Sequence, residues 1–265
     1  MYFIDTHAHL YKEYFPVTFK DAVQRAIHAN VRQIILPCVK AVNVSELFEA
    51  VNQFPDNLFP LIGLHPTDVK KENYKTELET LEKYLSDERV VGIGECGLDL
   101  YWDKTHLEEQ KIVMKKHLDW AKEYDYALSI HVRDAHAEMI RLLEEYGKEN
   151  IKGVMHCFSG GIQEAKWAVQ HGFYLGIGGV ITFKNSKLQH IIKEIGLQYL
   201  VLETDSPFLA PVPYRGKTNE STYIPIIAEK VAEIFDTSIH TVMEVTMQNS
   251  LRLFPKLREN RMVVH

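Results

Sequence analysis

The sequence has little cysteine, no excess of basic residues and no long apolar run. Its three cysteines, Cys38, Cys96 and Cys157, are odd in number and far apart. This excludes a disulfide-stapled scaffold and predicts reduced, buried thiols. Lysine and arginine number 30 against 36 aspartate and glutamate, which gives a formal net charge of −6. No global basic field draws the chain onto nucleic acid, so any polyanion must be held locally.

Signals for export or membrane insertion are also missing. Residues 1–5 carry neither a basic segment nor an apolar h-region, so we expect no signal peptide. The longest nearly apolar stretch, 173–183, is too short and too rich in glycine to span a bilayer. These absences predict a cytoplasmic protein that works without a membrane.

The sequence does contain a repeated alternation of apolar and amphipathic segments. Its 265 residues, 46% of them apolar, are enough for one barrel-sized domain or two small ones. Strand candidates that are mostly continuous apolar runs, typical of parallel strands buried on both faces, lie at 2–5, 33–37, 58–63, 90–95, 127–131, 153–156, 173–177 and 200–203. Helical periodicity appears between them, as at 19–27, 78–85, 113–121 and 139–143. Eight such units predict an α/β fold in which residues 1–265 form a single-domain (β/α)8 TIM barrel, with an open doubly wound sheet as the alternative.

Polar residues gather where these predicted strands end. A (β/α)8 barrel builds its active site from the C-terminal ends of its strands. His7 and His9 follow the first strand and, being two residues apart, share a face. Four other strands also end in a histidine or an acid, so the candidate metal ligands are His7, His9, Glu95, His131, His156 and Asp205. The sequence therefore predicts a metal site at the C-terminal mouth of the barrel.

Six ligands exceed what one tetrahedral ion needs, so we predict two divalent ions, roughly 3.5–4 Å apart as in other centres of this kind. The expected division gives one ion to His7, His9 and Asp205 and the other to His131 and His156. Glu95 comes from the strand opposite the eighth and is the candidate bridge. Imidazole ligands favour zinc or manganese over magnesium. The identity of the metal is left open among Mg²⁺, Mn²⁺ and Zn²⁺.

The motifs around these residues resemble those of the TatD-like metal-dependent deoxyribonucleases, a branch of the amidohydrolase-type barrels. The matching segments cover nearly the whole chain in order: DTHAHL (5–10), GLHP (63–66), GIGECGLD (92–99), HVRDA (131–135), HCFSG (156–160) and ETDSP (203–207). The resemblance implies a hydrolase of phosphodiester bonds in DNA, a 3′-to-5′ exonuclease that prefers single strands. It also implies that the same six side chains bind the metal.

One departure from the family pattern is visible after the eighth strand. The family often has GKRNEP there, whereas residues 216–221 read GKTNES, one cation and one proline short. The difference concerns how the substrate phosphate is bound rather than the hydrolytic chemistry.

Hydrolysis of a phosphodiester needs an activated water and positive charge near phosphorus. We expect Asp205 to act as the general base beside the metal, with Glu95 as the second catalytic carboxylate.

Candidate substrate contacts are His65, Arg133, Arg215 and Lys217. His65 reads equally well as a turn histidine, and Arg133 as one half of a helix-start ion pair with Asp134 or Glu138. Aromatic side chains on the expected mouth loops could stack unpaired bases or simply pack over the rim: Tyr11, Tyr14, Phe15, Tyr101, Trp102 and Tyr214. Glu203 either supports a ligand histidine or makes a buried hydrogen bond.

Two other functions are compatible with the same barrel. The first is an amidohydrolase-type enzyme acting on a small ester, lactone, amide or phosphoester. Many such enzymes carry a carbamylated lysine at the end of the fourth strand, where this chain has Glu95, which favours the nuclease-like branch. The second is a non-catalytic metal- or nucleic-acid-binding protein. Six candidate ligands at the open end of a barrel argue against it, because structural metal sites are closed to solvent. The expected partner is single-stranded DNA, and the expected state is a monomer.

Overall fold

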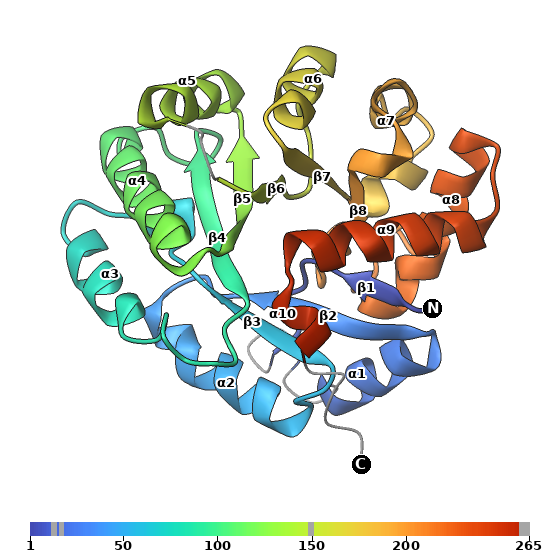
Figure 1. Ribbon diagram of the computed structural model, residues 1–265, viewed down its shortest axis with the longest axis horizontal. Coiled ribbons are helices and arrows are strands. Elements are labelled where there is room, and N and C mark those ends of the chain that lie inside the picture. The colour runs from blue at the N-terminus through green and yellow to red at the C-terminus, as the bar shows by residue number, and fades with distance from the viewer. Residues whose placement is uncertain (12–14, 16–18, 148–150, 260–265) are drawn as a thin grey trace.

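The computed structural model describes residues 1–11, 15, 19–147 and 151–259. Eight parallel strands form one sheet in the order β1 to β8, each hydrogen-bonded to its neighbour in sequence. Helices surround the strands (Figure 1), so the predicted (β/α)8 barrel is confirmed and the doubly wound sheet is excluded. The strands are β1 (Phe3–Asp5), β2 (Val31–Pro37), β3 (Leu58–Ile62), β4 (Gly92–Asp99), β5 (Ala127–Arg133), β6 (Gly153–Met155), β7 (Phe173–Ile177) and β8 (Leu200–Leu202).

The strands separate two apolar layers. Alternate strand residues such as Ile4, Ile35 and Val201 point into the barrel, where they meet residues of the last two helices. Their neighbours face outward against the surrounding helices. Side chains alternate along a strand, so continuous apolar runs fill both layers. The helices are α1 (Phe19–His28), α2 (Val44–Gln53), α3 (Tyr74–Glu82), α4 (Leu107–Tyr124), α5 (His136–Tyr146), α6 (Ile162–Gln170), α7 (Leu188–Ile195), α8 (Ile224–Phe235), α9 (Ile239–Leu253) and α10 (Lys256–Glu259).

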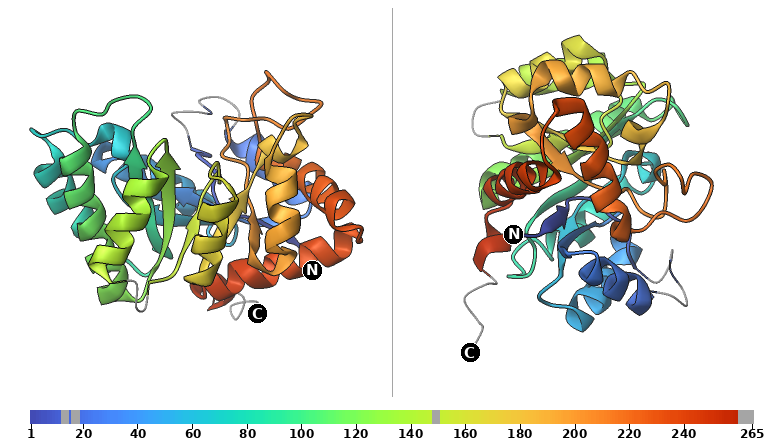
Figure 2. Two further views of the ribbon diagram at one scale, coloured as in Figure 1. Left: turned by 90° about the horizontal axis from the view of Figure 1, so that it is seen from above. Right: turned by 90° about the vertical axis from the view of Figure 1, so that its right-hand side faces the viewer.

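The two ends of the barrel differ. Helix α9 lies along one edge of the molecule, and the long loop after β8, residues 203–220, rises from the opposite edge (Figure 2). Leu253 and Phe254, at the end of α9, close the barrel interior at the first edge. The mouth at the C-terminal ends of the strands is therefore the end left for a site.

Residues at this mouth make the hydrogen bonds that join the first and last strands of the barrel. The Thr6 amide donates to the Leu202 carbonyl at 3.0 Å, and the Asp205 amide donates to the His7 carbonyl at 2.9 Å. The His9 amide donates to the Ser206 carbonyl at 2.7 Å. The segments after β1 and β8 are thus joined by backbone hydrogen bonds, which hold His7 and Asp205 side by side.

Two expectations about individual elements are adjusted by the structure. Helix α3 ends at Glu82, so Leu85 is buried in the turns that follow rather than on the helix. Strand β4 continues beyond Glu95 to Asp99, because residues 96–99 pair with β5.

Cys38 and Cys96 are buried, Cys157 is half-buried, and none forms a disulfide. In the part of the chain that the structure describes, none of the helices has the length and apolar character needed to cross a bilayer.

His117 of α4 gives the fold a pH dependence of its own. Its Nε2 accepts a hydrogen bond from the Leu64 amide at 3.1 Å, and burial lowers the pKa of His117 to about 3. The folded protein keeps this ring neutral, whereas the unfolded chain takes up a proton near pH 6.5. This residue therefore leaves the unfolding free energy unchanged above pH 6.5 and lowers it by about 1.4 kcal/mol per pH unit between there and pH 3.

We expect a His117→Gln variant to lose this one-proton contribution. Denaturant unfolding measured at several pH values below 6.5 should show a shallower decline for the variant than for the parent chain. Parallel declines in the two proteins would show that His117 is not a buried neutral imidazole.

Candidate metal centre

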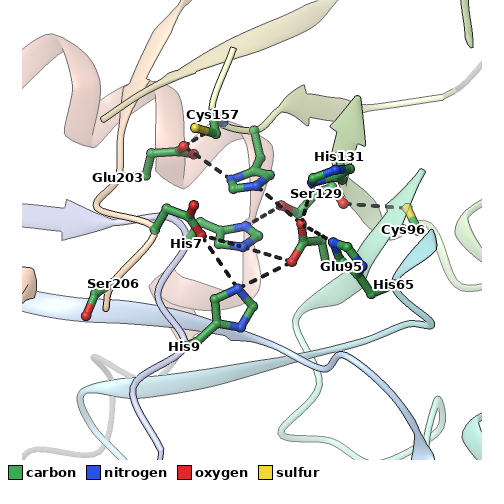
Figure 3. A network of polar contacts seen from close by, with 12 residues as sticks. His7, His9, His65, Glu95, Cys96, Ser129, His131, Cys157, Glu203 and Ser206 are labelled. Atoms are coloured by element: carbon green, nitrogen blue, oxygen red, sulfur yellow. Dashed lines mark hydrogen bonds and ion pairs between the residues drawn. The ribbon is translucent and has the colours of Figure 1, made fainter. Parts of the chain in front are cut away.

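The carboxylate of Glu95 is the centre of the site, and its two oxygens face different histidines (Figure 3). Oε2 lies 3.3 Å from His7 Nε2 and 3.4 Å from His9 Nε2. Oε1 lies 3.0 Å from His131 Nδ1 and 3.3 Å from His156 Nε2. One buried carboxylate therefore separates the imidazoles of the segment after β1, at Oε2, from those that follow β5 and β6, at Oε1, where His65 is a third neighbour.

Asp205 completes the ring on the side of the first pair. Its Oδ1 lies 3.6 Å from His9 Nε2 and 3.9 Å from His7 Nε2. His7, His9 and Glu95 form one group whose ligand atoms all lie within 4.8 Å of one another, and His7, His156 and Asp205 form another. The structure thus brings all six sequence-predicted ligands to one place.

Each of these histidines is held from behind by a second contact of its other ring nitrogen. His7 Nδ1 lies 2.9 Å from Ser129 Oγ, and His9 Nδ1 lies 3.4 Å from the Tyr11 hydroxyl. The two remaining rings face carboxylates: His131 Nε2 is 2.9 Å from Asp99 Oδ2, and His156 Nδ1 is 3.2 Å from Glu203 Oε1. Carboxylate partners fix the tautomer and orientation of ligand histidines in metal sites.

The carboxylates around His131 and His156 have a direct chemical consequence. Asp99 accepts a hydrogen bond from the outer nitrogen of His131, which leaves the inner nitrogen of the neutral ring to a cation, and Glu203 faces His156 Nδ1 as an ion-pair partner. His7 Nε2 is buried and has no hydrogen-bond partner of good geometry among the described residues. These inner nitrogens and the Glu95 oxygens are the donors that zinc, manganese and similar divalent metals accept. The residues present fit a divalent metal centre.

Burial and mutual charge set the pKa values in the centre. Burial opposes ionisation of Glu95, but the surrounding histidines, His65 and His7 foremost, outweigh it and hold the pKa of Glu95 well below its usual range. Burial lowers the pKa of His7 well below 6.5. Burial also opposes protonation of His156, yet Glu203 and Glu95 raise its pKa well above 6.5. The centre therefore holds an ionised carboxylate among imidazoles, and a histidine there must be neutral to bind a cation.

The comparisons with known proteins decide the family. The family model described as "TatD related DNase" matches residues 4–255. The chain belongs to the TatD family of metal-dependent hydrolases. This confirms the resemblance that the strand-end motifs predicted.

Individual relatives agree with the family assignment over nearly the whole length of both chains. The chain is 36% identical to YabD of Bacillus subtilis, named an uncharacterized metal-dependent hydrolase, over 94% of this chain and 98% of that one. The crystal structure of YjjV, a TatD homologue of Escherichia coli, superposes with a TM-score of 0.87 at 31% identity and covers 96% of this chain and 98% of that one. A TatD family hydrolase from Entamoeba histolytica gives a TM-score of 0.82 at 25% identity, covering 96% and 98%.

His65 lies in this TatD centre, but it differs from the four ring histidines. Its Nε2 is 3.3 Å from Glu95 Oε1. Its Nδ1 accepts a hydrogen bond from the Thr67 amide at 3.2 Å, and burial lowers the pKa of His65, so the ring is neutral. The single ring proton is then on Nε2 and points into the centre. In this tautomer His65 donates toward Glu95, and its Nε2 also belongs to a third group of candidate ligands, with Glu95 and His131, whose atoms all lie within 4.8 Å of one another.

The three cations expected to contact substrate lie on the rim, away from the carboxylate. Arg133 borders a cavity of about 680 Å³ that also reaches His131, His156 and Asp205. Its guanidinium lies 3.7 Å from the centre of the Tyr101 ring. No ion pair joins it to a carboxylate within the described residues, so the alternative of a pair with Asp134 or Glu138 is wrong. Arg215 lies over the Phe183 ring at 4.4 Å, and Lys217 lies 5.8 Å from the Tyr214 ring.

The structure also separates the aromatic side chains that the sequence left undecided. Tyr11 and Phe15 are buried and pack in the core. Tyr214 stacks on Tyr223, with ring centres 4.4 Å apart. Tyr101 and Trp102 remain exposed. Tyr14 lies outside the described residues.

Sequence reasoning missed Asp99 and Ser129 as supports of the centre. Asp99 is four residues beyond Glu95 on β4, and Ser129 is two before His131 on β5. Both spacings are even, so each supporting residue shares a strand face with the residue of the centre. The even spacing was the signal that could have identified them. It was missed for Asp99 because the predicted fourth strand ended at residue 95. Glu203 combines its two predicted roles, since it contacts His156 and also accepts a buried hydrogen bond from the Cys157 amide.

Glu203 gives a direct test of support from behind. It is fully buried, contacts His156 Nδ1 and accepts a 2.6 Å hydrogen bond from the Cys157 amide. A Cβ at Gly176 would lie 2.2 Å from Glu203 Oε2, so only glycine leaves room for this carboxylate. We expect Glu203→Gln to weaken metal binding by about 10- to 100-fold, as measured by competition with a chromogenic chelator. Glu144→Gln, which alters the acceptor of the surface Trp167 indole, is the matched control. Equal affinities in the two variants would contradict the supporting role.

Proposed function

We propose that this TatD protein cleaves phosphodiester bonds in DNA as a 3′-to-5′ exonuclease on single strands, with a water activated at a two-metal centre. The observation that carries the proposal is the division of Glu95, whose Oε2 faces His7 and His9 while Oε1 faces His131 and His156. A carboxylate set between two pairs of imidazoles is the arrangement that a bridging ligand requires.

The donor geometry suggests how the centre would be loaded. His7, His9 and Glu95 Oε2 would hold one divalent ion, with Asp205 beside them. His131, His156 and Glu95 Oε1 would hold the other. When bound, divalent ions lower the pKa of water to about 7 and neutralise charge on the phosphoryl oxygens. The imidazole-rich donors favour Zn²⁺ or Mn²⁺, and the family resemblance favours Mg²⁺ or Mn²⁺.

Asp205 would accept the proton of the attacking water. It is the only carboxylate among the described residues that line the cavity beside the centre. Burial raises the pKa of Asp205 to about 6, although His156 and His9 act in the opposite direction. A base with a pKa near the working pH transfers protons most effectively.

The residues around Asp205 suit a phosphate that enters from the mouth. His65 presents an N–H group toward Glu95, and a phosphate oxygen would accept a hydrogen bond from it. Arg133 borders the same cavity, and guanidinium binds phosphate through two parallel hydrogen bonds. Arg215 and Lys217 would contact phosphates farther along the strand. These cations supply the local positive charge that a protein of net charge −6 needs to hold DNA.

The test uses a single-stranded oligonucleotide labelled at its 5′ end. Protein stripped of metal and restored with Mg²⁺, Mn²⁺ or Zn²⁺ should produce a ladder that shortens from the 3′ end. The same strand labelled at its 3′ end should release labelled mononucleotide from the first time point. Absence of cleavage with every metal would overturn the DNA assignment, and a panel of small esters, lactones and phosphodiesters would then identify the reaction.

A further inference from the structure

Two aromatic side chains, Tyr101 and Trp102, are exposed at the mouth. Trp102 is 70% exposed and Tyr101 is 53% exposed, on the loop that follows β4. Their rings meet edge to face, with centres 5.0 Å apart. Exposed tryptophan forgoes the free energy of burial, and clustered exposed aromatic residues are characteristic of binding sites.

The backbone beneath these rings is fixed to the metal centre. Asp99 Oδ1 accepts hydrogen bonds from the amides of Tyr101, at 2.9 Å, and Trp102, at 3.1 Å. Its other oxygen, Oδ2, is the 2.9 Å partner of His131 Nε2. A single buried carboxylate thus sets the position of both the aromatic pair and a histidine of the centre. The pair is a fixed surface at a defined distance from the reaction.

Arg133 adds a positive charge to this surface. Its guanidinium carbon lies 3.7 Å from the centre of the Tyr101 ring and 5.6 Å from that of Trp102. Many surface cations are paired with carboxylates, as Lys116 is with Glu82 and Lys152 with Asp125. Arg133 has no such pair within the described residues, and it borders the cavity that reaches the centre. Its charge is held in place but not neutralised, which suits an anionic ligand.

We propose that Tyr101, Trp102 and Arg133 form a nucleotide subsite, in which Trp102 stacks one unpaired base and Arg133 binds the adjacent phosphate. The inference rests on the proposed function and deepens it, because it states what holds the strand beside the centre. An aromatic face is complementary to a base, and the neighbouring guanidinium is complementary to the phosphate. Bases inside a duplex have no free face, so the subsite selects single strands.

Binding is tested separately from cleavage. The Asp205→Asn protein, loaded with Mn²⁺, is titrated with a short oligothymidylate and with an abasic deoxyribose-phosphate strand of equal length and charge. Stacking predicts about 10- to 100-fold tighter binding of the thymidylate. Adding Trp102→Ala should remove most of this difference, and Trp102→Phe should restore it. Indole fluorescence should fall on binding and the fall should be absent from Trp102→Ala, because Trp102 is exposed whereas Trp120 is buried and Trp167 is half-buried.

The matched controls are an exposed aromatic and a surface cation elsewhere in the chain. Tyr84→Ala removes an exposed ring that packs on Phe48, and Lys152→Gln removes a cation paired with Asp125. Both should leave the preference for bases unchanged. Arg133→Ala should weaken binding of both strands and make binding less sensitive to salt.

The outcomes distinguish the two proposals. Equal binding of the thymidylate and abasic strands by the parent protein, or a preference unaffected by Trp102→Ala, overturns the stacking subsite alone. Failure to bind either strand overturns both the subsite and the assignment of DNA as substrate.

Discussion

Hydrolysis should fall by at least about 1,000-fold when Glu95 is replaced by glutamine. The amide cannot present two anionic oxygens to the two pairs of imidazoles that Glu95 separates. Charge stabilisation by a metal is worth several kcal/mol in the transition state, and each 1.4 kcal/mol is a factor of ten in rate. The variant should also retain fewer metal ions than the parent, because its bridging donor is weakened.

The measurement combines metal analysis with initial rates on labelled single-stranded DNA. Glu123→Gln, a change of the same kind at an exposed position of α4, should match the parent in both. A circular dichroism spectrum and unfolding midpoint close to those of the parent would show that Glu95→Gln folds. A folded Glu95→Gln protein with parental rates would remove Glu95 from the chemistry.

Replacement of Asp205 by asparagine should lower kcat by about 100- to 10,000-fold while much of the metal remains bound. Asp205 lies 3.6 Å or more from its nearest imidazole nitrogens and borders the cavity, whereas Glu95 is enclosed by histidines. Asparagine keeps an oxygen beside His9 but cannot accept the proton of water at neutral pH. Metal content should therefore separate the two variants, with a larger loss for Glu95→Gln.

The prediction is tested by comparing the turnover rate and the bound metal content of Asp205→Asn with those of Glu95→Gln. Near-normal turnover in Asp205→Asn would show that another group accepts the proton. Loss of all metal from Asp205→Asn would show instead that Asp205 acts chiefly as a ligand.

Much of the barrel could be predicted because parallel strands carry their signal locally. Runs such as 34–37 and 58–62 are apolar at consecutive positions and are buried on both faces. The end of β4 was missed because Gly97 and Asp99 look like loop residues. They are buried in the sheet by pairing with β5, where a Cβ at Gly97 would lie 1.9 Å from the His131 carbonyl oxygen. Burial of that kind depends on a strand distant in sequence.

The convergence of the candidate ligands was predictable for a similar reason. A barrel brings the ends of its strands together, so strand-end histidines and acids such as His131 and Glu95 must meet. The orientation of each ring was not predictable from the sequence. The contact of His7 with Ser129 spans 122 positions, and the amide of Thr67 determines which nitrogen of His65 carries the proton. The stacking of Arg133 on Tyr101 likewise joins the last residue of β5 to the loop after β4.

The most direct test of the two-metal account is a titration of metal-free protein with Mn²⁺. Bound metal, paramagnetic resonance and the rate of cleavage of single-stranded DNA are followed in the same samples. The account predicts that cleavage rises with the second equivalent, together with the spectrum of a spin-coupled pair of ions. Full activity at one equivalent, with the spectrum of an isolated ion, would contradict it.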